Sequence, residues 1–301
     1  MNNNTAAGYS GKEKLVLGLA IVFTYILMIF GNVVTTTGSG MACPDWPLCY
    51  GTVNPPKAIS VWIEWGHRMI GGVTGFLILA AAFVVWKKAG PAIRFFLKIA
   101  VATIVAAILL GGGIIIIDAP LLDSFMRIAV VSSHIVSSTI IFVTMIVAYH
   151  SVSSRSGDAA DRYSFLLFGL VYAQIVVGIV VRYAHASMAC GPDWPLCQGA
   201  ILPPDYSFEV LLHYTHRLIA YVIFGITLWK LTATLKAGIP ARRAAITFGL
   251  VLLQASIGIG IVQTVMFLPL LVLHGAAGFA LLGWTAYLGA PGMIGARAAE
   301  Q

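Results

Sequence analysis

The sequence predicts an all-α integral membrane protein with eight transmembrane helices. We expect two tandem four-helix bundles, related by a pseudo-twofold axis along the membrane normal. Of the 301 residues, 59% are hydrophobic and only 10% are charged, whereas about a quarter of the residues in a soluble domain are charged. Apolar runs near ~20 residues, the length that crosses ~30 Å of hydrocarbon as a helix, recur along the chain. An internal repeat divides these runs into two sets of four.

The polar segment 151–162 separates the two sets and is typical of a short cytoplasmic linker. It divides an N-terminal half, residues 1–150, from a C-terminal half, residues 163–301. The first apolar run has no small-residue cleavage site, so we expect a retained span and not a signal peptide. The expected spans run from about Lys14 to Thr36, Val61 to Trp86, Ile93 to Ile117, Ser124 to Tyr149, Tyr163 to Tyr183, Val210 to Leu231, Ala244 to Val265, and Leu268 to Leu288.

The net charge of +7 follows membrane topology and does not indicate a nucleic-acid partner. Cations gather at alternate helix ends, which places both termini in the cytoplasm, and a prokaryotic plasma membrane is the simplest location. The cation-rich ends carry Lys12, Lys14, Lys87, Lys88, Arg94, Lys98, Arg155, Arg162, Lys230, Lys236, Arg242, Arg243 and Arg297. The opposite ends carry only Lys57, Arg68, Arg127, Arg182 and Arg217.

The repeat is clearest in two loops on the outer side. Residues 41–49 match residues 188–197, with Gly191 as a single insertion, and His67-Arg68 matches His216-Arg217. Tyr25 and Gly31 match Tyr172 and Gly178 further upstream. Each half holds four spans, an even number, so both halves enter the membrane in the same direction, as in parallel-repeat bundles.

All four cysteines lie in the matching loops. Four cysteines allow three pairings, and proximity in the chain favours one bridge within each loop, Cys43–Cys49 and Cys190–Cys197, on the oxidising side of the membrane. Metal binding is the weaker alternative, because no histidine or second cysteine pair is close in sequence within either loop. A structural and a redox-active role both stay open. Trp46 and Trp194 are expected at the membrane interface or over a ligand.

Four of the seven histidines lie at similar depth in the outer parts of the even-numbered spans. A lone intramembrane histidine usually makes an interhelical hydrogen bond, but two pairs at one depth are typical of bis-histidine haem ligation. The residue four positions after each histidine is small and shares its helix face, which leaves room for a macrocycle edge. The histidines are His67, His134, His216 and His274, and the small residues are Gly71, Ser138, Ala220 and Gly278.

The remaining polar groups near these histidines allow alternatives. Arg68 and Arg217 each follow a histidine, and either pair with haem propionates or extend to lipid headgroups. Zinc is less favoured than haem iron, because no third and fourth ligands accompany each pair. His150 is expected in solvent at a cytoplasmic helix end, and His185 in an outer loop.

Glu64 distinguishes the two halves. It precedes His67 by one helical turn, and its repeat equivalent is His213. A carboxylate in an apolar site is costly and suits proton transfer. We therefore expect the first half to be catalytic and the second half to retain a haem.

Taken together, Glu64-x-x-His67-Arg68, the three later histidines and the paired loop cysteines resemble the haem A synthases of the haem–copper oxidase pathway. The resemblance covers essentially the whole chain. It implies oxidation of a porphyrin methyl group of haem O to a formyl group by successive hydroxylations. It also implies that His67 and His134 bracket the substrate haem, while His216 and His274 ligate a resident haem b.

By the same resemblance, Glu64 lies near the reacting methyl group and Cys43 and Cys49 assist activity. Haem O synthase (protohaem farnesyltransferase), a membrane electron acceptor and a second copy of the chain are the candidate partners. Some members have an additional acidic residue one turn before the glutamate, where this chain has Val61, so a two-carboxylate mechanism is in doubt. His213 receives no role from the resemblance.

Two rival functions explain part of this pattern. A quinol-linked dihaem electron-transfer cytochrome accounts for the four histidines but not for a carboxylate in only one half. A haem-handling transporter is consistent with parallel repeats, although only Gly111-Gly112-Gly113 resembles a kink within a span.

Overall fold

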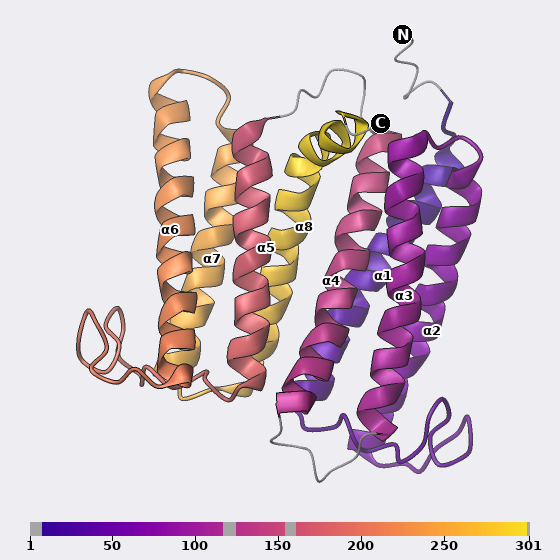
Figure 1. Ribbon diagram of the computed structural model, residues 1–301, viewed down its shortest axis with the longest axis horizontal. Coiled ribbons are helices and arrows are strands. Elements are labelled where there is room, and N and C mark those ends of the chain that lie inside the picture. Colours follow the sequence, from indigo (N-terminus) through magenta and orange to yellow (C-terminus); the bar gives the residue numbers. More distant parts are fainter. Residues whose placement is uncertain (1–7, 117–124, 154–160, 300–301) are drawn as a thin grey trace. The chain divides into compact units, whose positions relative to one another are not determined.

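The computed structural model describes residues 8–116, 125–153 and 161–299. Within these ranges the chain is all-α, and its only β-type pairings are two isolated bridges in the cysteine loops. Each helix is long and apolar enough to cross a membrane, so the predicted all-α class with eight spans is confirmed (Figure 1). The helices are α1 (Gly11–Thr36), α2 (Ile59–Trp86), α3 (Pro91–Ile116), α4 (Phe125–Ser153), α5 (Arg162–Tyr183), α6 (Phe208–Lys236), α7 (Arg242–Gln263) and α8 (Leu268–Ala299).

Most helices extend beyond their apolar spans, because polar residues continue the backbone hydrogen-bond pattern past the hydrocarbon. The eighth helix shows the largest difference, continuing through Pro291 to Ala299. The fourth continues to Ser153, and this extension corrects one expectation. His150 is not in solvent: it is buried, and its ring packs edge-on against Tyr287 with centroids 4.9 Å apart.

The chain divides into two compact units. The first unit comprises Met1–Phe165 with Ala286–Gln301, and the second comprises Leu166–Thr285. The expected linker, 151–162, lies just before this division, and its residues 154–160 are outside the described ranges. The pseudo-twofold relation of the halves stays a prediction.

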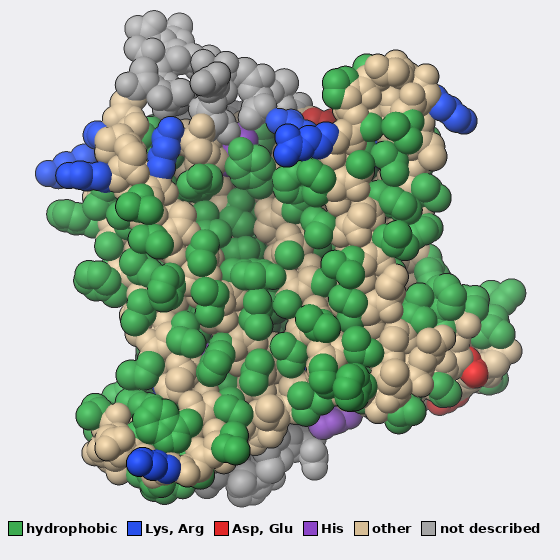
Figure 2. All heavy atoms as spheres, turned by 180° about the vertical axis from the view of Figure 1, so that it is seen from behind, with side chains coloured by type: hydrophobic (Ala, Val, Ile, Leu, Met, Phe, Trp, Pro, Cys, Tyr) green, Lys and Arg blue, Asp and Glu red, His purple; other side chains and the backbone are tan. Residues whose placement is uncertain are grey.

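In the first unit four helices form a closed bundle. α1 packs against α2 and α4, while α3 packs against α4 and α2. Its buried core is rich in alanine, including Ala20, Ala81 and Ala100, and small side chains let apolar helices approach closely. On the face seen in Figure 2, hydrophobic side chains cover the length of the helices and the cations lie at their ends.

A polar anchor fixes the start of α1, at the end of the first unit away from the cysteine loop. The Glu13 carboxylate accepts a hydrogen bond from the Ser10 backbone (2.7 Å) and closes a capping box. Lys88, after the end of α2, lies 2.5 Å from the same carboxylate. The pair ties α1 to the α2–α3 connection.

In the second unit α6 packs against α7, with the rings of Phe224 and Phe248 5.3 Å apart. The Trp284 indole on α8 donates a hydrogen bond to the Thr247 hydroxyl on α7 (2.8 Å). Two helices of this unit, α6 and α8, carry the second pair of histidines, His216 and His274.

Candidate functional site

The histidines come together in pairs, one pair in each unit. His67 on α2 is close enough to His134 on α4 for their charges to interact. The same holds for His216 on α6 and His274 on α8. The two histidines of each half, which the family resemblance groups together, therefore lie close to one another.

Each histidine lies against a glycine of the preceding helix. A Cβ atom at that glycine would come within 2.9–3.2 Å of the imidazole Cε1, which is tighter than ordinary van der Waals contact, so any larger residue there would push against the ring. The contacts are Gly31 with His67 (3.0 Å), Gly111 with His134 (3.2 Å), Gly178 with His216 (2.9 Å) and Gly258 with His274 (3.1 Å). Four repetitions of this contact indicate imidazole rings held in a set orientation.

One ring nitrogen of His134 has a clear partner. Nδ1 lies 2.9 Å from the carbonyl oxygen of Ala107, so Nδ1 carries the proton and donates it. This hydrogen bond leaves the Nε2 lone pair available to a metal, the usual arrangement for a ligating histidine. The Nδ1 atoms of His67, His216 and His274 are buried and without a hydrogen-bond partner among the described residues.

Two imidazoles from separate helices of one unit, each with a glycine beside it, are a ligand set that suits a haem iron. Among the described residues no group of three or more His, Cys, Asp or Glu side chains is close enough to share a metal ion. A four-ligand zinc site therefore has no support in these ranges.

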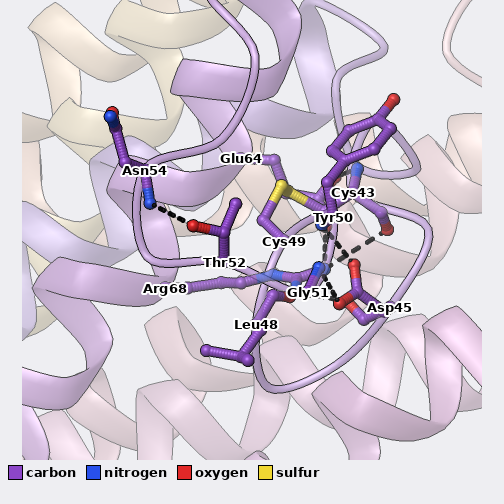
Figure 3. The surroundings of a disulfide bond; sticks show 10 residues. All are labelled: Cys43, Asp45, Leu48, Cys49, Tyr50, Gly51, Thr52, Asn54, Glu64 and Arg68. Atoms are coloured by element: carbon purple, nitrogen blue, oxygen red, sulfur yellow. Dashed lines mark hydrogen bonds and ion pairs between the residues drawn. A yellow bond between two sulfur atoms is a disulfide. The ribbon is translucent and has the colours of Figure 1, made fainter.

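The loop between α1 and α2 is closed by the Cys43–Cys49 disulfide. Two adjacent residues, Tyr50 and Gly51, have positive φ, and their backbone N–H groups donate to the Asp45 carboxylate (2.5 and 2.7 Å). Figure 3 shows this turn beside the disulfide. The disulfide and these hydrogen bonds together restrict the loop to few backbone conformations.

Arg68 fastens this loop to α2. Its Nη1 donates to the carbonyl oxygens of Asp45 (2.6 Å) and Leu48, and its Nη2 to that of Cys43 (3.5 Å). Haem propionates and lipid headgroups were the partners expected from sequence, whereas the partners in the structure are main-chain carbonyls of the loop (Figure 3).

Glu64 completes the fastening. One carboxylate oxygen accepts from the Cys43 backbone N–H (2.7 Å), and the other lies 2.5 Å from Arg68 Nη2. Glu64 as a whole residue is 3% exposed. A buried carboxylate is stable only with such partners. We call the contacts by which Glu64 and Arg68 hold the Cys43–Cys49 loop the loop clamp, and Glu64 is part of it in addition to any catalytic role.

The second unit repeats the clamp with a different residue in the place of Glu64. The loop is closed by Cys190–Cys197, and Arg217 Nη1 donates to the carbonyl oxygens of Asp193 (2.7 Å) and Leu196 (2.5 Å). His213 takes the position of the carboxylate: the Cys190 N–H lies 3.3 Å from Nδ1, and Arg217 Nε lies 3.3 Å from Nε2. The structure thus gives His213 the role that the sequence left open.

The two clamps differ in strength. A carboxylate accepts both hydrogen bonds, but a neutral imidazole has one acceptor nitrogen and one N–H. His213 can therefore accept a hydrogen bond from only one of its two neighbouring donors at a time, either the Cys190 N–H or the Arg217 Nε–H. The contacts of 3.3 Å, against 2.7 and 2.5 Å at Glu64, agree with this difference.

The loops also dock differently. In the first unit the Trp46 ring lies against Gly112 on α3, where a Cβ would come within 3.2 Å of it, next to the Gly111 that contacts His134. In the second unit the Tyr221 hydroxyl on α6 donates to the Pro195 carbonyl (3.0 Å). The residue that follows Gly258 is Ile259, which leaves no equivalent glycine surface for Trp194.

Outside the spans, an Asx turn orders the approach to α6. The Ser207 backbone N–H (2.9 Å) and hydroxyl (2.8 Å) both donate to the Asp205 carboxylate, and they lower the pKa of Asp205. His185 lies exposed in the α5–α6 connection, as expected.

The glutamines of the second unit were not anticipated from sequence. Gln174 Nε2 donates to the His216 carbonyl (2.9 Å) and lies 3.4 Å from His216 Nε2. Gln254 Nε2 lies 3.1 Å from His274 Nε2. Each glutamine precedes the histidine-contacting glycine by four residues, a spacing that could have indicated them.

Comparison with known proteins gives one consistent result. A protein of Bacillus licheniformis named "Heme A synthase" is 29% identical over 283 residues, covering 87% of this chain and 91% of its own. Proteins of the same name from Alkalihalophilus pseudofirmus and Mesorhizobium japonicum are 30% and 26% identical. They cover 83% and 88% of this chain and 86% of their own length in each case. The COX15-CtaA model, described as cytochrome oxidase assembly protein, matches residues 14–61 and 57–286. The chain belongs to this family.

Proposed function

We propose that this protein is a haem A synthase, which oxidises a porphyrin methyl group of haem O to a formyl group. The observation that carries the proposal is the duplicated histidine pair with a buried carboxylate in only one copy, in a chain whose relatives are named heme A synthase. The first unit is the substrate side and the second unit is the side of a resident haem b.

In the first unit, His67 and His134 would hold the substrate haem through its iron. The glycine contacts fix the planes of the imidazoles, and the Ala107 carbonyl fixes the tautomer of His134. In the second unit, His216 and His274 hold haem b, which when bound supplies one-electron redox chemistry. Apolar side chains of the surrounding helices keep water away from both histidine pairs.

Glu64 is the proposed proton acceptor, or stabiliser of developing positive charge, near the reacting methyl group. Its carboxylate is held one turn from His67 by Arg68 and the Cys43 N–H. The same contacts make the disulfide loop a positioning element for Glu64. Loss of the Cys43–Cys49 bridge would therefore disturb the carboxylate first and the histidines only indirectly.

For topology, we place both termini in the cytoplasm and the disulfide loops on the outer face of a prokaryotic plasma membrane. The supporting observation is the bias of Lys and Arg toward the helix ends away from the disulfide loops. Haem O synthase is the reasonable upstream partner, because it makes the substrate, and a membrane electron acceptor must take the electrons. The relatives' names favour this enzyme over an electron-transfer cytochrome or a transporter.

The test is to co-express the full chain with a haem O supplier and to identify the extracted haems by mass. We expect haem A to appear in place of haem O. Haem O that accumulates unchanged with intact, haem-loaded protein, under conditions that support turnover, would overturn the proposal.

A further inference from the structure

One polar side chain of α1 lies close to the histidine pair of the first unit. Asn32 directly follows Gly31, where a Cβ atom would come within 3.0 Å of the His67 ring. It lies near the outer end of α1, within an apolar helix long enough to cross a membrane. A carboxamide in such a place is costly unless it is hydrogen-bonded, so the surroundings of Asn32 indicate what it can bind.

α1 and α4 meet along a regular seam in the first unit. A Cβ atom at Gly18 would lie 3.9 Å from the Tyr149 ring, and Tyr25 stacks on Phe142 with ring centroids 6.1 Å apart. From the first contact to the second, the position moves seven residues forward on α1 and seven residues back on α4. Residues seven apart share a helix face, so this seam has a fixed antiparallel register.

One further step of seven residues along the seam reaches the histidine pair. It places Asn32 on α1 opposite Ile135 on α4, which directly follows His134. Asn32 is therefore close to both histidines of the first unit, because it adjoins the glycine that contacts His67 and faces the turn of α4 that carries His134. The side chain opposite it, Ile135, is aliphatic and offers the carboxamide no hydrogen bond.

The Thr36 hydroxyl, one turn further along α1, orients this carboxamide. It donates to the Asn32 main-chain carbonyl (2.6 Å) and lies 3.2 Å from the side-chain oxygen Oδ1. A carboxamide has two lone pairs on its oxygen and two N–H groups on its nitrogen, so the contact with Thr36 does not exhaust its capacity. The N–H groups suit a neutral oxygen acceptor such as an alcohol hydroxyl group.

The second unit has different residues at the matching places. The repeat aligns Asn32 with Ile179 and Thr36 with Tyr183. Ile179 is a buried aliphatic side chain, so the corresponding position on α5 cannot hydrogen-bond a ligand through its side chain. The carboxamide thus belongs to the unit to which we assign the substrate, and not to the unit to which we assign haem b.

The substrate and the resident haem differ in their hydrogen-bonding groups. Haem O carries an alcohol hydroxyl group in its isoprenoid side chain, where haem b has a vinyl group, and the first oxidation adds a second hydroxyl group to the ring methyl. A hydroxyl group in an apolar site is costly without a partner, and so is a carboxamide beside a ligand that offers none. A site built to bind a hydroxyl group therefore rejects an analogue that lacks it.

We propose that Asn32, oriented by Thr36, binds an alcohol hydroxyl group of the substrate haem and so makes the first unit selective for haems that carry this group. The selectivity rests on the proposed function of the first unit. Two hydroxyl groups have the required chemistry: the one in the side chain of haem O, and the one that the first oxidation adds to the methyl group.

The experiment measures haem affinity in the first unit of purified full-length protein that holds haem b in its second unit. Haem b, haem O and the hydroxymethyl derivative of haem O are titrated separately; the low-spin absorption band is followed, and the bound haem is identified by mass. Asn32→Ile installs the residue of the second unit. We expect it to weaken the binding of a hydroxyl-bearing haem by about tenfold and that of haem b by less than about twofold, because only the former loses a hydrogen bond.

The three haems distinguish the two hydroxyl groups. If Asn32→Ile weakens haem O, the contact is to the side-chain hydroxyl; if it weakens only the hydroxymethyl derivative, the contact is to the hydroxyl added by oxidation. Thr36→Val, which removes only the orienting hydroxyl, should cause a smaller loss for the same haems. Val33→Ile, one position from Asn32 and on another face of α1, is the matched control and should leave all three affinities unchanged.

Two outcomes would overturn the role of Asn32. Asn32→Ile that weakens all three haems equally would show disturbed packing, and Asn32→Ile that leaves all three affinities unchanged would show no contact. In both cases the haem site of the first unit stands if haem O binding is lost in His67→Ala with His134→Ala. If the wild type and this double variant bind haem O equally, the proposed function itself fails.

Discussion

The two units have the same clamp but different surroundings. In both, an arginine after the histidine binds the carbonyls of a disulfide loop, and a side chain four residues earlier meets the N–H of the loop's first cysteine. In both, glycine gives each imidazole its space. The shared features are therefore scaffold. We expect the separate functions of the units to depend on the features that differ between them: Glu64, the contact of Trp46 with Gly112, and the glutamines beside the histidines of the second unit.

The comparison of the two units also shows that Glu64 has a structural position in addition to its expected catalytic role. Its absence from the second unit suggests catalysis, yet its equivalent, His213, occupies the same structural position. A purely structural clamp and a catalytic carboxylate are therefore both consistent with a simple loss-of-function variant. Only exchange of the two residues separates these roles.

The largest expected effect comes from that exchange. Glu64→His gives the first unit the clamp of the second, so the Cys43–Cys49 loop should stay closed while haem A formation falls by about 100-fold or more, the usual contribution of a proton-transfer group. Glu64→Ala should lose haem A as well and still bind haem. Haem mass and the intactness of the disulfide are measured on the same samples.

The control is His213→Glu, which gives the second loop a two-acceptor clamp. It should leave haem A formation near the wild-type level and slow the reduction of Cys190–Cys197 by thiols. Normal haem A production by Glu64→His would mean that Glu64 is a clamp and nothing more.

A smaller effect is expected from the glycines that contact the imidazoles. Gly178→Ala forces its new methyl group to within 2.9 Å of the His216 ring, and overpacking of this kind costs about 1–3 kcal/mol. Haem b retention should weaken by about tenfold, because 1.4 kcal/mol corresponds to a factor of ten. Gly31→Ala should instead weaken binding at His67 and lower haem A formation.

Each variant has a matched control on a helix of the same unit. Gly169→Ala on α5 and Gly72→Ala on α2 add a methyl group that meets no atom within 4 Å. Both should behave as the wild type in haem spectra. Equal effects of Gly169→Ala and Gly178→Ala would show that helix packing, and not the imidazole contact, is responsible.

The smallest expected effect concerns the docking of the first loop. Gly112→Ile places on α3 the residue type of the second unit and displaces the Trp46 ring, which lies 3.2 Å from the position of a Cβ there. Amide hydrogen exchange in residues 41–53 should become a few-fold faster, because the loop loses its contact with α3. Gly113→Ala, whose methyl group would meet no atom within 4 Å, should leave exchange unchanged; if it accelerates exchange equally, Trp46 does not dock the loop.

Much of the fold was predictable because the membrane restricts the choices. The hydropathy of the spans predicted most helix ends within a few residues, with the C-terminal end of α8 as the main exception, and the repeat identified the paired loops and histidines. Helix ends were less predictable: α4 continues past Tyr149 and buries His150, since hydropathy does not register a helix that persists in polar sequence.

The positions of the four histidines could be predicted from the sequence, whereas the residues that contact them could not; their role as haem ligands stays a prediction. The histidines stood out because charged or titratable groups are rare in membrane spans. The contacts of Arg68 and Arg217 with main-chain carbonyls were not predictable, because every residue has a carbonyl oxygen and the sequence does not indicate which ones a side chain will reach. Gly31 and Gly178 were aligned by the repeat, but their contacts with His67 and His216 require the packing of adjacent helices.

The division of labour between the units is tested most directly by the mass of the haems extracted from one double variant, His67→Ala with His134→Ala, in cells that make haem O. We predict that this protein retains haem b through His216 and His274 and contains no haem A. Haem A formed by this variant, with its second unit intact, would contradict the assignment of the chemistry to the first unit.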